Sequence, residues 1–221
     1  MTKQLKVLVT GGAGYIGSHA VLALKDAGHQ PVVIDNLVTG FRWAVPDDVP
    51  FVEGNIADEE LVASTLRTHA IDAIMHFAGS IIVPESVENP LKYYRNNTAA
   101  SRSLIDSAVQ AGIRHFIFSS TAATYGIPES SPVREDMPKL PINPYGMSKL
   151  MTERMLADVA FAHPLNYCAL RYFNVAGSDS TGRIGQSTRL ATLLEAALSP
   201  LPRRGRTAIM GKVMAGMIPG A

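Results

Sequence analysis

Four glycines fall within the seven residues Gly11–Gly17, which read GGAGYIG and follow closely on the short apolar run Lys6–Val9. The segment Tyr15–Ala27 that comes next carries apolar residues at helical spacing. A glycine-rich turn between a strand and a helix lets an anionic pyrophosphate approach the backbone, where the amides at the helix N-terminus face it. This turn therefore predicts an α/β fold that binds a dinucleotide.

Short apolar runs and helical patterns alternate along the rest of the chain. Each apolar run is bounded by turn residues, as expected of a buried strand, and such an alternation is typical of a parallel sheet. We therefore predict a Rossmann-type, doubly wound parallel sheet with helices on both faces. The further strands are expected at 31–34, 50–52, 73–77, 116–118 and 167–170, and the further helices at 59–67, 90–111 and 145–161.

The glycine positions and the next strand end together indicate which dinucleotide is bound. We assign the tight turn to Gly12, the close approach of the phosphate to Gly14 and the packing of the helix to Gly17. Asp35 ends the second predicted strand, where a carboxylate can accept both ribose hydroxyls of NAD and repels the 2′-phosphate of NADP. The following residue, Asn36, brings no positive charge for such a phosphate. NAD is the predicted cofactor, with contacts at Gly11, Gly14, Tyr15, Ile16, Gly17 and Asp35.

Tyr145 and Lys149 are one helical turn apart, so their side chains share one face of the predicted helix. A free tyrosine has a pKa of about 10, and a nearby ammonium or a positive nicotinamide ring favours its phenolate form. The pair follows a predicted strand that ends in hydroxyl-bearing residues, Ser119–Thr121, at the carboxyl edge of the sheet. This arrangement predicts Tyr145 as a proton-transfer group beside the fixed charge of Lys149.

Charge and cysteine content narrow the possible partners. With 20 basic and 19 acidic residues, the net charge of +1 provides no general attraction to nucleic acid or to an anionic membrane. The single cysteine, Cys168, permits no intramolecular disulfide, and we expect it in the core of an apolar strand. The histidines lack the spacing of metal ligands, so no metal is expected. We predict a cytoplasmic protein without nucleic-acid or membrane partners.

Three longer segments, TGGAGYIG, FSSTAATYG and PYGMSK, occur in the order found in the extended short-chain dehydrogenases, and the chain resembles that family over about residues 5–187. The resemblance implies that Tyr145 is the catalytic acid or base. It also implies that Lys149 binds the nicotinamide ribose and lowers the pKa of the tyrosine, while Thr121 hydrogen-bonds the reacting oxygen.

Shorter segments, DNL, HFAG, PESV, YYRNN and LRYFNVAG, resemble the branch of this family that epimerises UDP-sugars at C4. A UDP-sugar substrate and a tightly held NAD are what this resemblance implies. It adds NAD contacts at Asn36, Asn55, Ile56, Phe77, Ala78, Gly79, Asn97, Ser119, Tyr145, Lys149, Tyr172 and Phe173. Substrate contacts are implied for Ser120, Thr121, Tyr145 and Asn174.

The mechanism implied by the resemblance removes a hydride and a proton from C4 and returns them after the 4-keto sugar has turned, so that NAD stays bound. A rival branch, the sugar-nucleotide 4,6-dehydratases, carries an Asp-Glu pair where this chain has Ala122 and Ala123. Alanines cannot move protons, which disfavours dehydration. Another NAD-dependent sugar-nucleotide enzyme and a catalytically impaired NAD-binding fragment remain as alternatives.

The end of the chain departs from this pattern. We expect an NAD-binding domain over residues 1–182 and an incomplete or atypical substrate-domain segment over 183–221, with the family resemblance fading around Gln186–Thr188. Family members commonly continue further, so a truncated product is expected. They also dimerise through helices that correspond to 90–111 and 145–161, which makes a homodimer an expectation by analogy.

Overall fold

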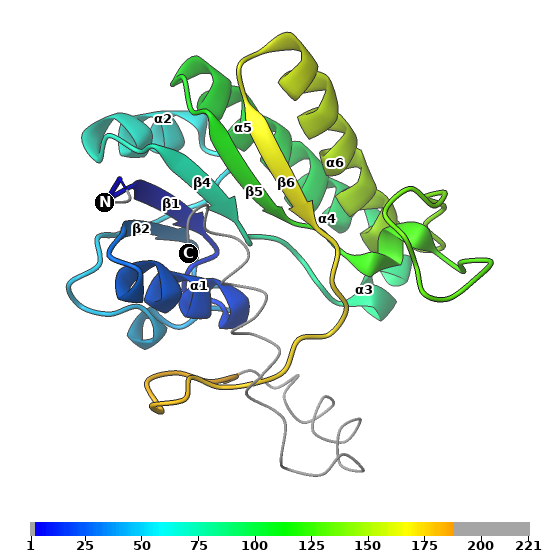
Figure 1. The fold of residues 1–221 in the computed structure, drawn as a ribbon, viewed down its shortest axis with the longest axis horizontal. Helices are drawn as coiled ribbons and strands as arrows, with labels where there is room; N and C mark the ends of the chain where they lie inside the picture. The colour runs from blue at the N-terminus through cyan, green and yellow to red at the C-terminus, as the bar shows by residue number, and fades with distance from the viewer. Residues whose placement is uncertain (1–2, 188–221) are drawn as a thin grey trace.

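The computed structural model describes residues 3–187 and contains the predicted parallel sheet (Figure 1). Six strands lie in the order β3-β2-β1-β4-β5-β6, and every neighbouring pair is parallel. The strands are β1 Lys6–Thr10, β2 Gln30–Asp35, β3 Phe51–Glu53, β4 Ala73–His76, β5 His115–Ser119 and β6 Asn166–Leu170. Each predicted strand is confirmed, with no bound shifted by more than one residue.

Helices cover both faces of the sheet, as predicted (Figure 1). On one face α1 (Tyr15–Asp26) packs Val21 and Leu24 against Val7 and Val9 of β1. On the other face α2 (Glu59–Thr68), α5 (Ala100–Gln110) and α6 (Pro144–Ala162) pack against Leu8. Successive residues of a strand point to opposite faces, so β1 feeds both cores.

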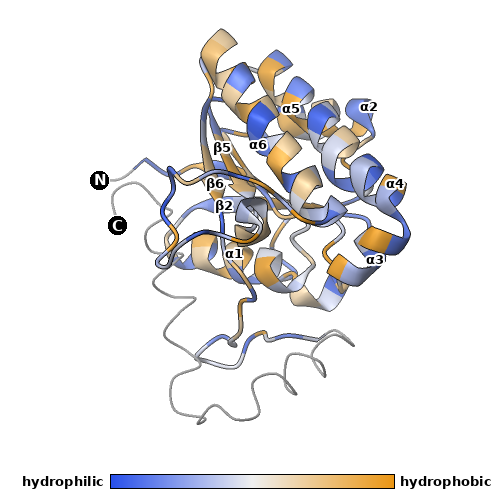
Figure 2. Cartoon of the chain, turned by 90° about the vertical axis from the view of Figure 1, so that its right-hand side faces the viewer, coloured by the Kyte–Doolittle hydropathy of each residue, from blue (hydrophilic) through white to orange (hydrophobic). Residues whose placement is uncertain are grey.

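The apolar faces of these helices are turned inward. In Figure 2 α5 and α6 carry both hydrophobic and hydrophilic stretches, as expected of helices with one face on a sheet. Two helix ends also match the sequence: Asp58 caps α2 by accepting from the Leu61 N–H at 3.0 Å, and Gly28 follows α1 with a φ of +78°. Within residues 3–187, no helix is long and apolar enough to cross a membrane.

One predicted helix is divided into three parts. The segment 90–111 forms α4 (Pro90–Tyr93), the π-helical turn η2 (Tyr94–Ala99) and α5. Apolar spacing cannot reveal a π-turn, which inserts extra backbone without ending the helix. A short helix that the sequence did not indicate, α3 (Val83–Glu88), precedes it, and two 3₁₀ turns, η1 (Arg42–Ala44) and η3 (Ala122–Tyr125), complete the elements.

The expectation that Cys168 lies in the core is wrong. Its strand, β6, is the last strand of the described sheet, and the thiol is exposed. In the described sheet β6 has a neighbouring strand on one side only, and its first three residues are exposed in succession, which an apolar run in the sequence does not disclose.

After β6 the chain crosses to α1 without regular structure. The Tyr15 hydroxyl donates to the Gly177 carbonyl at 2.6 Å, and the Arg183 guanidinium donates to both carboxylate oxygens of Asp26 at 2.9 and 2.7 Å. The domain boundary predicted at residue 182 therefore falls inside a turn that is bonded to α1. Of the segment 183–221, predicted to be incomplete or atypical, residues 188–221 lie outside the described residues.

Candidate active site

The glycine-rich turn lies at the carboxyl end of β1, with α1 beginning directly after it. Gly14 is the N-cap of α1 in an extended conformation, and no side chain caps the helix. A β-carbon at Gly14 would meet one atom, the Gly11 carbonyl oxygen, at 3.3 Å, whereas one at Gly17 would lie 2.1 Å from the same oxygen. The helix N-terminus is thus open to a ligand and closely packed on the turn, which fits a pyrophosphate.

The left-handed residue of the turn is Gly11, with a φ of +69°, whereas Gly12, to which the sequence analysis assigned the tight turn, has no positive φ. A β-carbon at Gly11 would also lie 2.6 Å from the Ala78 nitrogen. Gly12 is restricted instead by packing, because its β-carbon would lie 2.7 Å from the Val33 methyl groups. Gly11 is therefore required by its backbone conformation and Gly12 by the space beside Val33, a difference that the sequence alone does not reveal.

Asp35 ends β2 beside this turn. Its carboxylate accepts the Ala13 N–H at 3.0 Å and the Leu37 N–H at 2.8 Å, which fixes both oxygens at the sheet edge. Each carboxylate oxygen has a further lone pair that can accept a ribose hydroxyl. Asn55 follows β3 on the same edge, where its side-chain oxygen accepts the Ala57 N–H at 2.9 Å.

Lys149 is buried, with 2% of its surface exposed. Its ammonium donates to the Ser119 carbonyl at 2.9 Å and lies 5.0 Å from the centre of the Phe118 ring. Burial lowers the pKa of Lys149 to about 8. A β-carbon at Gly79 would lie 3.5 Å from the ammonium, so Gly79 leaves space at this point of the site.

Tyr145 and Thr121 lie beside Lys149. The α6 helix that carries Tyr145 begins at Asn143, whose side chain accepts the Gly146 N–H at 2.8 Å, while Thr121 ends β5 and caps the turn η3. Burial raises the pKa of Tyr145, and the Thr121 side chain lowers it to a lesser degree. Burial outweighs the Thr121 interaction, and the lowering of this pKa expected from Lys149 stays a prediction.

Asn97 joins this group from the π-helical turn η2, and it is 1% exposed. Its side-chain oxygen accepts the Ser80 N–H at 2.7 Å, and its amide nitrogen donates to the Ser80 carbonyl at 2.9 Å and to the Ser148 hydroxyl at 3.1 Å. The side chain that the sequence proposed as a cofactor contact thus holds the segment after Gly79 against α6.

Ser120, which the sequence analysis proposed as a substrate contact, is turned toward Glu153 in the interior. It is 2% exposed, and its hydroxyl donates to a carboxylate oxygen of Glu153. Glu153 also receives bonds from the Arg171 guanidinium at 2.7 and 2.9 Å, and Arg171 donates to the Tyr125 hydroxyl at 2.7 Å. The sequence analysis missed this buried ion pair, since neither Glu153 nor Arg171 stands out by spacing.

The remaining candidate residues divide into packed and exposed groups. Ser119 and Tyr172 share a hydrogen bond between their hydroxyls, and burial raises the pKa of Tyr172 to about 12. Tyr15 is engaged with Gly177, as described above. Ile56 is buried, Phe77 and Ala78 follow β4, and Ile16 lies in the first turn of α1. Three candidates face solvent. They are Phe173, which is 74% exposed, Asn174, which follows it, and Asn36, which follows β2.

Titratable residues of the metal-binding kind do not gather elsewhere in the described part of the chain. Among residues 3–187, no group of three or more His, Cys, Asp or Glu is placed to hold a metal ion.

The parallel sheet, the open helix N-terminus after β1 and the Tyr145–Lys149 pair at the carboxyl edge define a dinucleotide-binding protein of the short-chain dehydrogenase type. Residues 7–211 match the model of the NAD dependent epimerase/dehydratase family, and the chain belongs to that family. The match extends past the limit at Gln186–Thr188 that the sequence analysis had expected.

Several similar proteins are named UDP-glucose 4-epimerase. The chain is 59% identical over 208 residues to the UDP-glucose 4-epimerase of Azospirillum brasilense, a match that covers 93% of this chain and 60% of the relative. The crystal structure of UDP-glucose 4-epimerase from Brucella ovis in complex with NAD aligns with a TM-score of 0.84 at 46% identity, covering 89% of this chain and 62% of that one. The crystal structure of UDP-glucose 4-epimerase from Bifidobacterium longum in complex with NAD+ and UDP aligns with a TM-score of 0.79 at 35% identity. This match covers 83% of this chain and 58% of that one. The chain thus spans about 60% of the length of its relatives.

Proposed function

We propose that this chain binds NAD and carries the cofactor site and catalytic base of a UDP-glucose 4-epimerase, which interconverts UDP-glucose and UDP-galactose. The observation that carries the proposal is the placement of Tyr145, Lys149 and Thr121 at the sheet edge next to the phosphate-binding turn. The names of the relatives, two of whose crystal structures contain NAD, support the same reaction.

The residues present fit NAD. The open N-terminus of α1 at Gly14 would hold the pyrophosphate, and the Asp35 carboxylate would accept the ribose hydroxyls of the adenosine half. Lys149 would hold the other ribose, because its ammonium lies close to Gly79 at this edge of the sheet. When bound, NAD supplies a reversible hydride acceptor for C4 of the sugar.

Tyr145 performs the proton transfer in this proposal. Its phenolate removes the proton of the sugar 4-hydroxyl and returns it after the 4-keto sugar has turned its other face, which inverts C4. The Thr121 hydroxyl holds the sugar oxygen and opposes the rise in the pKa of Tyr145 that burial causes. The buried Lys149 ammonium supplies a fixed positive charge on the same face of α6. Asn174, exposed after β6, is available to the nucleotide sugar.

Dehydration is disfavoured, because Ala122 and Ala123 open the 3₁₀ turn η3 where a dehydratase needs an acid and a base. We propose an NAD-binding domain over residues 1–182, followed by a substrate-domain segment over residues 183–221. Remote contacts to the nucleotide position the sugar, so turnover depends on that second part.

The function is tested by incubating the purified chain with UDP-galactose and measuring UDP-glucose, with Tyr145→Phe as the matched control. Conversion above the control supports the epimerase. No conversion while NAD co-purifies indicates an impaired NAD-binding fragment, and neither conversion nor bound NAD overturns the proposal. A second arm compares NAD with NADP: wild type prefers NAD, and Asp35→Ala loses about tenfold or more of that preference.

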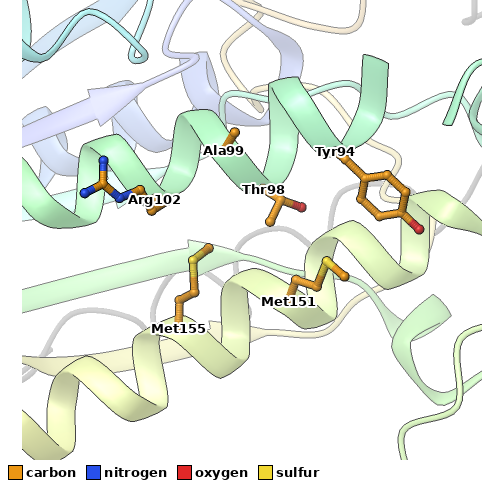
Figure 3. Close-up of a pocket in the computed structure, with 6 residues that line it drawn as sticks. All are labelled: Tyr94, Thr98, Ala99, Arg102, Met151 and Met155. Carbon is orange, nitrogen blue, oxygen red and sulfur yellow. The ribbon is translucent and has the colours of Figure 1, made fainter. Parts of the chain in front are cut away.

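We also infer that the protein is a cytoplasmic homodimer. A groove between η2, α5 and α6 is lined by Tyr94, Thr98, Ala99, Arg102, Met151 and Met155, and the two methionines face the neighbouring helix across it (Figure 3). An apolar groove of this kind can be covered by the same face of a second copy around a two-fold axis. Sedimentation of wild type and Met151→Glu tests the dimer. We expect wild type to sediment as a dimer and Met151→Glu as a monomer, and a monomeric wild type would contradict the inference.

A further inference from the structure

His76 is a fully buried side chain that the proposed chemistry does not use. It ends β4, is 1% exposed, and stacks on the Phe118 ring at 5.5 Å with the Phe116 ring edge-on at 6.0 Å. Its two ring nitrogens both have partners: Nδ1 lies 2.6 Å from the Thr10 hydroxyl, and Nε2 lies 2.8 Å from the Ser101 hydroxyl. The ring therefore joins β1 to α5 through the interior.

The direction of each bond follows from its neighbours. Ser101 donates its proton to the Asn97 carbonyl, which can only accept, so the Ser101 oxygen must accept from His76. His76 then carries its proton on Nε2. Burial and the charge of Lys149 lower the pKa of His76 to about 3, so the ring is neutral and Nδ1 accepts from Thr10.

The two ends of this chain of bonds lie at the proposed nicotinamide side of the site. At one end the Thr10 oxygen accepts the Ala78 N–H at 3.4 Å, next to the Gly11 turn. At the other end is the carbonyl of Asn97, in the π-helical turn, which also accepts from the Thr152 hydroxyl at 3.2 Å. The side chain of Asn97 in turn brackets Ser80, one residue after the FAG segment.

We propose that His76 is a positioning residue: as a one-directional relay from Thr10 to Ser101, it holds the segment Phe77–Gly79 and the π-turn at Asn97 in register around the nicotinamide half of the cofactor. This inference rests on the proposed NAD site. Both segments that it joins lie against Lys149, since a β-carbon at Gly79 would lie 2.9 Å from the Asn97 side-chain oxygen and 3.5 Å from the ammonium.

A purely structural role for His76 makes a different prediction. If His76 only fills space in the core, its loss weakens the binding of both halves of the dinucleotide equally or leaves both unchanged. Loss of the relay displaces the nicotinamide side and leaves the turn at Gly14 and the Asp35 carboxylate, which hold the adenosine half, in place. Binding of NADH can therefore be compared with binding of ADP-ribose, which lacks the nicotinamide.

The test variant is Ser101→Ala, which removes the last link of the relay, with Ser107→Ala as the matched control, a buried serine further along the same helix. His76→Phe keeps an aromatic ring between Phe116 and Phe118 and serves as the second variant. Each purified protein, freed of bound cofactor, is titrated calorimetrically with NADH and with ADP-ribose, and the fluorescence of bound NADH is recorded.

We expect Ser101→Ala to bind NADH about tenfold more weakly than wild type and to bind ADP-ribose within about twofold of wild type. The variant leaves the Asn97 carbonyl and the His76 imidazole without their Ser101 partner, and both groups support only the nicotinamide side of the site. His76→Phe loses at least as much NADH affinity, and Ser107→Ala matches wild type. Unchanged NADH affinity in both relay variants, or an equal loss of both ligands in Ser101→Ala, overturns the relay. A wild-type chain that binds neither ligand overturns the NAD site itself.

Discussion

The ammonium nitrogen of Lys149 lies 5.0 Å from the centre of the Phe118 ring and donates a hydrogen bond to the carbonyl of the next residue, Ser119. Both partners are uncharged, so within residues 3–187 a carbonyl dipole and an aromatic ring hold this cation in the interior. The arrangement keeps the charge in one place beside Tyr145, and desolvation makes it costly.

Because burial lowers the pKa of Lys149 from 10.5 to about 8, the unfolded chain binds more protons than the folded one between these values. The contribution of Lys149 to the free energy of unfolding therefore rises with pH across that interval. Lys149→Met lacks this contribution. Urea unfolding at about pH 7.5 and about pH 9.5 should show the stability of wild type gaining about 2 kcal/mol relative to the variant.

Tyrosines that ionise in the same range are common to both proteins, so they cancel in the difference. Parallel pH curves for wild type and Lys149→Met would show that the ammonium is not desolvated. At about pH 7.5 we expect the variant to be the more stable protein and to bind NAD more weakly, a separation of stability from function.

Thr121 acts on the pKa of Tyr145 against the effect of burial. In Thr121→Val this opposing interaction is lost, so the pKa of Tyr145 rises further and the basic form is less populated at neutral pH. We expect the rate of epimerisation to fall about 10- to 100-fold and the acidic limb of its pH profile to move to higher pH.

Thr121→Ser is the control for that experiment, since it keeps the hydroxyl that also accepts the Ala123 N–H at 3.1 Å. Its profile should coincide with that of wild type. An unchanged profile for Thr121→Val, with a lower rate alone, would place the threonine with the substrate and not with Tyr145.

The ion pair between Glu153 and Arg171 should dominate the stability of the region behind Thr121, because 6% and 19% of the two side chains are exposed. Arg171→Leu leaves the Glu153 carboxylate buried, with Ser120 still donating to it, and should lower the free energy of unfolding by about 3–5 kcal/mol. Chemical unfolding of the variant measures this directly.

A matched surface pair is available for comparison. Arg134 and Asp136 are 74% and 75% exposed, so Arg134→Leu should change stability by less than about 1 kcal/mol. Adding Glu153→Leu to Arg171→Leu should restore much of the loss, because no isolated charge then stays buried. Equal losses in the single and double variants would count against this explanation.

Gly14 and Gly17 should separate cofactor binding from folding. A β-carbon at Gly14 meets one oxygen at 3.3 Å, so Gly14→Ala should fold with nearly wild-type stability and lose about tenfold or more in NAD affinity by obstructing the phosphate. Gly17→Ala places a β-carbon 2.1 Å from a carbonyl oxygen and should lower the melting temperature. Thermal unfolding and NAD titration of both variants check the pair, and a Gly17→Ala protein as stable as wild type would contradict the packing.

Local pattern was sufficient for the sheet and helices, because strand and helix spacings are properties of neighbouring residues. The apolar runs marked all six strands to within two residues, and Asp58 and Gly28 marked two helix ends. The same reasoning failed for Cys168, whose exposure depends on what covers the edge strand β6.

For the site, residue type and order along the chain determined which groups come to the carboxyl edge: the glycine turn, Asp35, Thr121, Tyr145 and Lys149. Parallel strands end at one edge, so residues that follow strands must meet there. Tertiary structure alone decided what these groups are bonded to. It turned Ser120 toward Glu153 and Arg171, made Gly11 the left-handed residue, raised the pKa of Tyr145, and joined Thr10 to Asn97 through His76. Desolvation and hydrogen-bond partners come from residues distant in sequence, which no local pattern records.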